Sequence, residues 1–143
     1  MAHPHPSVRA LLEAEAEEDP FVAIRRRARA LVAQAMELGW EGPPFDMTEL
    51  ASLRGLEVCP SSGFADDQDA CVVPGRGLVN ARKHPVRQRY SVAHEVGHTL
   101  FPDYEEELRR HGRLWRREGD DSDFERLCQA AGAEFLMPLD AFL

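Results

Sequence analysis

The chain has 143 residues, of which 43% are hydrophobic, and its formal net charge at pH 7 is −8. This length and composition fit one globular domain with a hydrophobic core and exclude an intrinsically disordered chain. The acidic charge argues against a general nucleic-acid binder, because binding to phosphates needs a basic surface. No direct contact with nucleic acid is therefore expected.

The cysteines and the hydropathy pattern bear on the cellular compartment. Cys59, Cys71 and Cys128 include no CxxC pair. An odd and sparse set of cysteines forms no disulfide framework and is typical of a reducing compartment. No apolar run approaches the length of a membrane span, and the opening segment MAHPHPSVRA lacks the apolar core of a signal peptide. These features predict a cytoplasmic protein with no membrane partner.

The patterns along the chain predict an α+β fold that is mostly helical. We expect a disordered tail at residues 1–6 and a single domain over residues 7–143. In chain order the domain should contain a helical N-terminal part, a small sheet, a central helix, a charged segment and a last helix. These parts are expected at residues 7–54, 56–80, 88–101, 103–123 and 123–137.

Capping residues predict two helices in the N-terminal part. Asp19 and Pro20 precede a helix over residues 21–38, because Asp is a common N-cap and Pro fits the first helical position. Asp46 begins a short helix over residues 46–54 with the spacing of a capping box. The pair resembles a helix-turn-helix, which would fit a DNA-binding regulator, but it has no basic recognition face.

Two local clusters of basic residues each allow two interpretations. Both fit solvated surfaces. The first also fits a docking patch, and the second also fits a site for acidic or carboxylate-bearing substrate segments. The clusters are Arg25, Arg26, Arg27 and Arg29, and then Arg82, Lys83, His84, Arg87 and Arg89.

After Gly55 the hydrophobic period changes from that of helices to that of strands. Short apolar segments bounded by turn residues predict strands at residues 56–59, 70–73 and 77–80. Their spacing indicates a small three-stranded antiparallel sheet beside the helix that follows.

That helix contains an HExxH motif formed by His94, Glu95 and His98. Residues four apart lie on the same face of an α-helix, so the two imidazoles can point at one zinc ion. Glu95 lies about 100° around the helix from His94, where it can reach a water bound to the metal as a general base. The alternative is a buried core helix with a chance glutamate between two histidines.

A catalytic zinc needs about three protein ligands and an open position for water. Tyr104 stands six residues after His98, where the HExxHxxGxxH pattern has its third histidine, so the three-histidine version is excluded. His111 is one candidate, although it lies in a polar segment. Glu125 opens an otherwise apolar helix and is another candidate, but its spacing from Ser122 also fits a capping box. Spacing alone leaves this choice open.

The motif helix is preceded by RQRYSVA and followed, after a charged segment, by FERLCQAAGAEFLMP. Together these segments resemble the ImmA/IrrE family of zinc metallopeptidases. Its members share a block like RxRFTxAHExGH and a later helix that begins with a ligand glutamate and ends in LLMP. The resemblance covers roughly residues 46–138. The matching positions are Arg89, Tyr90, His94, Glu95, His98, Glu125, Leu136, Met137 and Pro138.

Two departures from the family pattern are present. Many members have an Ala-Asn or Ala-Asp pair and a phenylalanine in the last helix, where this chain has Cys128, Gln129 and Ala131. This is closest to the IrrE-like branch, which has a similar Glu-x-Leu-Cys segment. Family proteins also often continue well past the LMP block, whereas this chain stops at Leu143, so we expect a short form or a fragment.

The resemblance implies a zincin-like metallopeptidase domain that binds one Zn²⁺ per chain. By it, His94, His98 and Glu125 are the metal ligands and Glu95 is the catalytic carboxylate. Mn²⁺ is also compatible with these ligands, although imidazole suits zinc. Such enzymes usually have a further donor for the oxyanion, and the chain offers two candidates for that role or for a partner of the ligands, Tyr104 and His111.

The resemblance also implies a protein substrate, typically a helix-turn-helix repressor that is cut to switch on stress-response or mobile-element genes. The main alternative is a non-catalytic, metal-containing binding module that regulates a transcription factor by docking. A third hypothesis, a DNA-binding regulator built on residues 46–54, is opposed by the net charge of −8.

Overall fold

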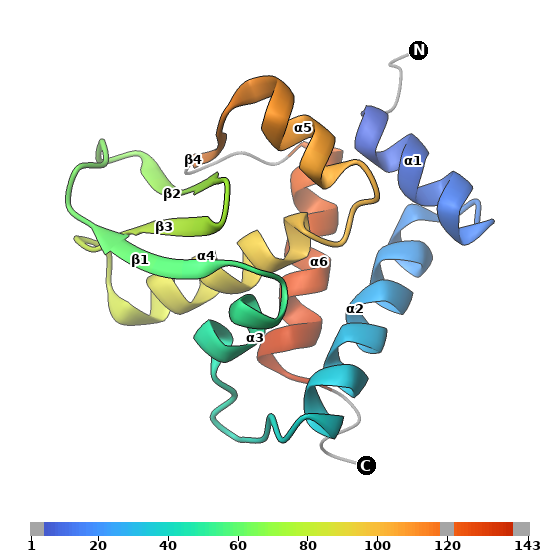
Figure 1. The fold of residues 1–143 in the computed structure, drawn as a ribbon, viewed down its shortest axis with the longest axis horizontal. Coiled ribbons are helices and arrows are strands. Elements are labelled where there is room, and N and C mark those ends of the chain that lie inside the picture. The colour runs from blue at the N-terminus through green and yellow to red at the C-terminus, as the bar shows by residue number, and fades with distance from the viewer. Residues whose placement is uncertain (1–4, 118–121, 139–143) are drawn as a thin grey trace.

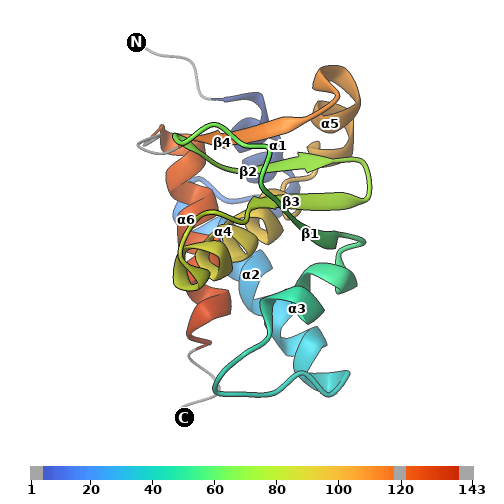
Figure 2. The same ribbon diagram turned by 90° about the vertical axis from the view of Figure 1, so that its left-hand side faces the viewer.

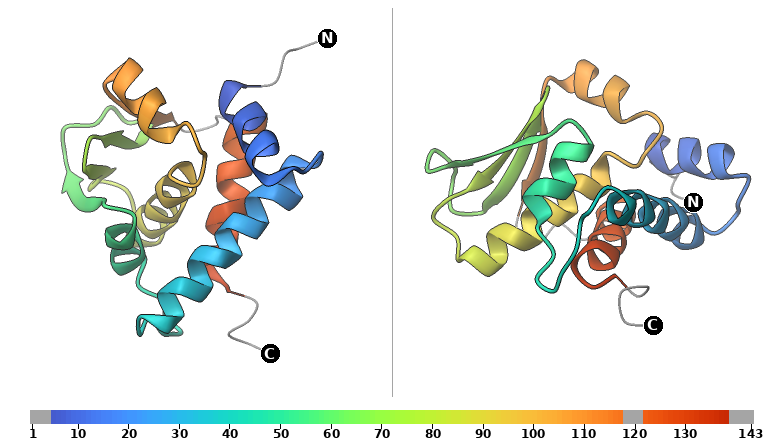
Figure 3. Two further views of the ribbon diagram at one scale, coloured as in Figure 1. Left: turned by 45° about the vertical axis from the view of Figure 1, so that its right-hand side comes forward. Right: turned by 60° about the horizontal axis from the view of Figure 1, so that its bottom comes forward.

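The helix that carries the HExxH motif, α4 (Pro85–His98), lies between a four-stranded sheet and the last helix, α6 (Asp123–Leu136) (Figure 1). This computed structural model describes residues 5–117 and 122–138. The long helix α2 packs against the other side of α6, as the left view of Figure 3 shows. No helix in these two stretches of the chain is both long and apolar enough to span a membrane.

Six helices lie in the described part of the chain. They are α1 (Pro6–Glu15), α2 (Pro20–Glu37), α3 (Met47–Leu53), α4 (Pro85–His98), α5 (Tyr104–His111) and α6 (Asp123–Leu136). The caps predicted for α2 and α3 are present, because Asp19 accepts from the Phe21 N–H and Asp46 accepts from the Thr48 N–H.

Helix α1 begins at Pro6, one residue before the helical part predicted at residues 7–54. Pro6 occupies its first turn and the His5 side chain accepts a hydrogen bond from the Ser7 N–H. His5 and Pro6 therefore belong to this helix and its cap, although both fall in the tail predicted at residues 1–6; the rest of that tail, residues 1–4, lies outside the described residues. Histidine and proline made the segment look irregular, yet both suit a helix start.

The sheet differs from the antiparallel three-stranded arrangement that the strand spacing indicated. Its order is β1 (Glu57–Ser61), β3 (Arg76–Asn80), β2 (Gln68–Val73), β4 (Leu114–Arg117). Strands β2 and β3 form an antiparallel hairpin, but β1 pairs in parallel with the outer edge of β3, so the sheet is mixed (Figure 2). The other edge of β2 is covered by β4, which comes from the charged segment.

Arginine side chains connect both ends of α4 to other elements. At its N-terminal end, Arg87 forms a two-pronged ion pair with the buried carboxylate of Asp69 on β2, at 3.0 and 2.8 Å. At its C-terminal end, Arg54 donates to the Thr99 carbonyl at 2.7 Å and Arg27 donates to the Leu100 carbonyl at 3.0 Å. These bonds satisfy carbonyl groups that a helix end leaves without partners.

Both basic clusters contain arginines that form hydrogen bonds or ion pairs with other residues of this chain. Besides Arg87, Arg89 of the second cluster donates to the Phe45 carbonyl at 3.0 Å. Three arginines of the first cluster pair with glutamates of this chain: Arg26 with Glu17, Arg27 with Glu15, and Arg29 with Glu134.

Helices α4 and α6 cross at very short range. A Cβ atom added to Gly97 would lie 2.8 Å from the carbonyl oxygen of Cys128 and 3.2 Å from the Cβ of Ala131. A Cβ atom added to Gly132 would instead meet the backbone of Ala93 at 3.5 Å, which is ordinary van der Waals contact. Small residues on α6 thus allow α4 to approach closely.

We predict that Gly97→Ala destabilises the chain, because the new methyl group would press on backbone that cannot move aside. Overpacking of this kind costs about 1–3 kcal/mol. The matched control is Gly132→Ala, which has room and should be neutral or stabilising by up to about 1 kcal/mol through helix propensity. Urea unfolding of the metal-free proteins measures both, and equal stabilities for the two variants would contradict a crossing limited by contact at Gly97.

Candidate metal centre

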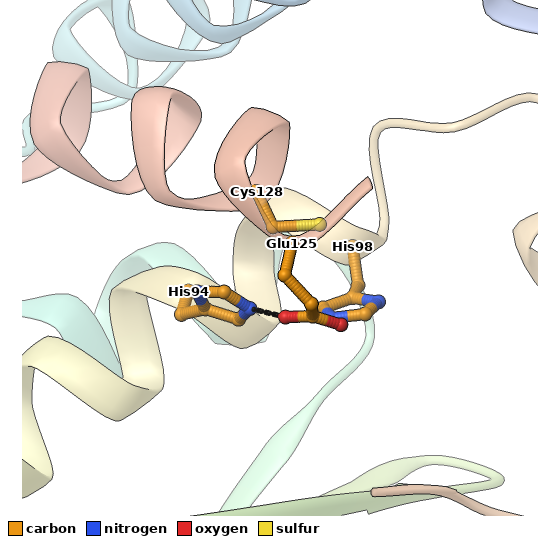
Figure 4. Close-up of side chains that lie close together, drawn as sticks. All are labelled: His94, His98, Glu125 and Cys128. Carbon is orange, nitrogen blue, oxygen red and sulfur yellow. Dashed lines mark hydrogen bonds and ion pairs between the residues drawn. The ribbon is translucent and has the colours of Figure 1, made fainter. Parts of the chain in front are cut away.

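The crossing of α4 and α6 brings four potential metal ligands together. His94 and His98 come from α4, and Glu125 and Cys128 come from α6 (Figure 4). All four residues are buried, and one ligand atom from each lies within 4.8 Å of the others. Imidazole nitrogen, carboxylate oxygen and thiolate sulfur are the ligand types that zinc takes in proteins, so the chemistry of these residues fits a metal ion.

The Glu125 carboxylate lies between the two imidazoles. Its Oε2 is 2.5 Å from His94 Nε2 and its Oε1 is 3.5 Å from His98 Nε2. Burial by itself would raise the pKa of Glu125, but the hydrogen bonds from His94 and His98 outweigh burial and hold this pKa well below its usual range. The carboxyl group is therefore ionised, the form in which it can bind a cation.

Glu125 also takes part in the cap of its own helix. Ser122 is the N-cap of α6, and its hydroxyl oxygen accepts a hydrogen bond from the Glu125 backbone N–H at 3.3 Å. The side chain of Glu125 meanwhile contacts His94 and His98. The backbone N–H of Glu125 thus serves the helix cap, while its carboxylate contacts the two histidines.

Glu95 and Tyr104 lie close to this cluster. Glu95 is 2% exposed and follows His94 on α4. Burial, and then the negative charge of Glu95, raises the pKa of Tyr104 to about 12. Its hydroxyl oxygen is buried and has no hydrogen-bond partner among the described residues. Tyr104 therefore keeps its proton at physiological pH and presents a donor that none of the described residues uses.

The structure does not bring His111 to the cluster. It is exposed at the end of α5, and its Nε2 lies 3.2 Å from a carboxylate oxygen of Glu107 one helical turn earlier. Of the two candidates for a further donor, Tyr104 has its hydroxyl group buried near Glu95, whereas His111 is exposed and away from the cluster.

No role at the site was predicted for Cys128 from the sequence. The structure places it in the cluster, where burial raises the pKa of its thiol. Its position three residues after Glu125 was the available signal, because residues three apart share a helix face.

Aromatic rings close the site on the side of α1. The ring of Phe124 contacts the edge of His98 with 5.1 Å between centroids, and His5 stacks on Phe124 at 4.2 Å. The cavity beside His98, which Tyr104 also lines, has a volume of about 40 Å³. This space holds a few water molecules, and a peptide does not fit in it.

Comparison with known proteins gives two findings. Residues 63–143 match the family described as the IrrE N-terminal-like domain, peptidase family M78. Across an alignment of 140 residues that covers 94% of this chain, the sequence is 29% identical to the radiation response metalloprotease IrrE of Deinococcus radiodurans. The aligned region spans 40% of the length of that relative. The family match covers more than half of the chain and contains all four residues of the cluster, so the chain belongs to the IrrE N-terminal-like family of metallopeptidases.

Proposed function

We propose that this protein is a zinc-dependent endopeptidase in which His94, His98 and Glu125 are the metal ligands and Glu95 is the general base. The observation that carries this proposal is the convergence of two buried imidazoles from α4 on one ionised carboxylate from α6. A structural core has no need for such a cluster, because burying a carboxylate with two histidines costs solvation energy that apolar packing avoids.

In this proposal, each chemical role in peptide hydrolysis belongs to a different group at or near the cluster. A bound divalent metal supplies an acidic water molecule and polarises the carbonyl of the scissile bond. Glu95, buried beside His94, accepts a proton from the attacking water and passes it to the leaving amine. Tyr104 donates a hydrogen bond to the carbonyl oxygen as negative charge develops there, and its raised pKa keeps the proton in place for that role.

The substrate and the ion are further parts of this proposal. Peptidase-family membership supports a protein substrate, and the resemblance to ImmA/IrrE proteins supports a helix-turn-helix repressor whose cleavage induces stress-response or mobile-element genes. The relative is named for a radiation response, which is in keeping with such a role. Zinc is favoured over manganese because two of the ligands are imidazoles. The three free cysteines support a cytoplasmic location.

A non-catalytic binding module is the second candidate function, and Cys128 is the observation that favours it. Zinc sites with four protein ligands are structural, whereas catalytic sites keep one position open. Cys128 brings the number of potential ligands in the cluster to four. Metal binding and peptide cleavage must therefore be measured separately.

The purified chain should contain about one zinc per molecule. His94→Ala and Glu125→Ala should each weaken zinc binding by at least about 100-fold, because losing a ligand costs more than the 10–100-fold typical of a ligand's outer partner. His111→Ala is the control and should bind zinc normally. Competition with a chromophoric chelator gives the affinities, and full affinity in Glu125→Ala would return Glu125 to a capping role alone.

Glu95→Gln tests whether zinc binding and peptide cleavage depend on different residues. Glu95→Gln should retain zinc and lose peptide cleavage by at least about 100-fold, the usual contribution of a general base. Glu105→Gln, which neutralises an exposed carboxylate on α5, is the matched control and should cleave normally. Cleavage of candidate repressors is followed by gel electrophoresis with zinc content measured on the same samples. Normal cleavage by Glu95→Gln would rule out the proposed mechanism.

Tyr104→Phe tests the oxyanion donor. Loss of one such donor lowers kcat by about 10²–10³-fold, and zinc affinity should not change. Because the Tyr104 hydroxyl has no partner among the described residues, its removal should leave the metal-free chain equally stable or more stable by about 1 kcal/mol. Kinetics and urea unfolding measure the two effects. A destabilised variant with normal kcat would mean that the hydroxyl serves packing and not catalysis.

A further inference from the structure

Each of the two crossing helices presents a pair of potential ligands on one face. On α4 the pair is His94 and His98, four residues apart, and on α6 it is Glu125 and Cys128, three residues apart (Figure 4). Pairs with these spacings lie side by side on a helix. Helix bundles that bind metals between helices use the same device, a Glu-x-x-His pair projecting inward from one helix. Glu125-x-x-Cys128 has the same spacing with a thiol in place of the imidazole.

The helix crossing holds Cys128 close to the histidines. Its backbone carbonyl lies so near α4 that a Cβ atom on Gly97 would be 2.8 Å away. The side chain is fully buried, and its sulfur is within 4.8 Å of the ligand atoms of the other three residues. The thiol is thus not a lone cysteine at a surface but one member of a compact set from two packed helices.

We propose that Cys128 is a fourth metal donor, so that the site without substrate is closed by two histidines, one glutamate and one cysteine. This inference rests on the proposed function, which supplies the other three ligands, and it requires that Cys128 leave the metal before water binds there for catalysis. Four protein ligands leave no position for water in a tetrahedral zinc site. A coordinated thiol loses its proton to solvent as the metal binds, even where burial disfavours the free thiolate.

The fourth donor also determines which metal the site prefers. Thiolate is a soft ligand that favours zinc and other thiophilic ions, whereas manganese prefers carboxylate, carbonyl and water. With His94, His98 and Glu125 alone, the site would accept both classes of ion. Cys128 makes it selective for zinc.

Cobalt(II) spectroscopy tests this proposal without relying on enzymatic activity. The metal-free wild type, Cys128→Ala and Cys59→Ser are titrated with Co²⁺, and the near-ultraviolet thiolate-to-cobalt charge-transfer band is recorded. Wild type and Cys59→Ser, which lacks a thiol outside the cluster, should both show the band at one ion per chain. Cys128→Ala should bind one Co²⁺ without the band. Cys128→Ser keeps the size of the side chain and provides the same comparison if Cys128→Ala does not fold.

Zinc and manganese affinities of the same proteins provide the second measurement. Loss of the thiol should lower zinc affinity by at least about tenfold, since even outer partners of ligands contribute that much, and should change manganese affinity far less. One Co²⁺ bound by the wild type without a charge-transfer band would overturn the role of Cys128 and leave the three-ligand site intact. A band that persists in Cys128→Ala would also overturn it. A wild type that binds no metal at all would remove both this inference and the proposed function.

Discussion

The candidate site depends on the short distance between the backbones of α4 and α6. Glycine at position 97 and small residues on α6 let the two helices approach until further contact is limited by the Cys128 carbonyl. Because the helices are so close, the short side chain of Glu125 reaches both imidazoles of the HExxH motif. Packing and chemistry are therefore coupled, since anything that separates the helices also separates the ligands.

The remaining elements keep α4 in place against that contact. The Arg87–Asp69 ion pair joins its first turn to the sheet, and Arg54 and Arg27 bind the carbonyl groups at its other end. Ion pairs with a buried carboxylate add little net stability, because desolvation offsets the attraction. Their effect is geometric: a ligand-bearing helix fixed at both ends holds its histidines in one orientation, which a metal site requires.

The sequence predicted the parts of this arrangement that are encoded locally. The HExxH spacing and the Ser122 cap each lie within one element, and each is found on its expected helix. The parts that were missed depend on contacts between distant segments. Strand β4 pairs with β2 across roughly forty residues of chain, and β1 joins the sheet in parallel because its neighbour in sequence is occupied on both edges. No site role was predicted for Cys128, because the two histidines near it belong to another helix and are brought to it only by the helix crossing.

The candidate metal site is bounded more firmly at the crossing of α4 and α6 than on the side of α1. At the helix crossing, backbone contact limits any movement. On the side of α1, closure rests on the stacking of His5 upon Phe124 and on one hydrogen bond from Ser7 to Asp103, interactions that each contribute about 1 kcal/mol. The contacts of α1 are therefore the weaker of the two boundaries, whereas the helix crossing holds the metal ligands in position.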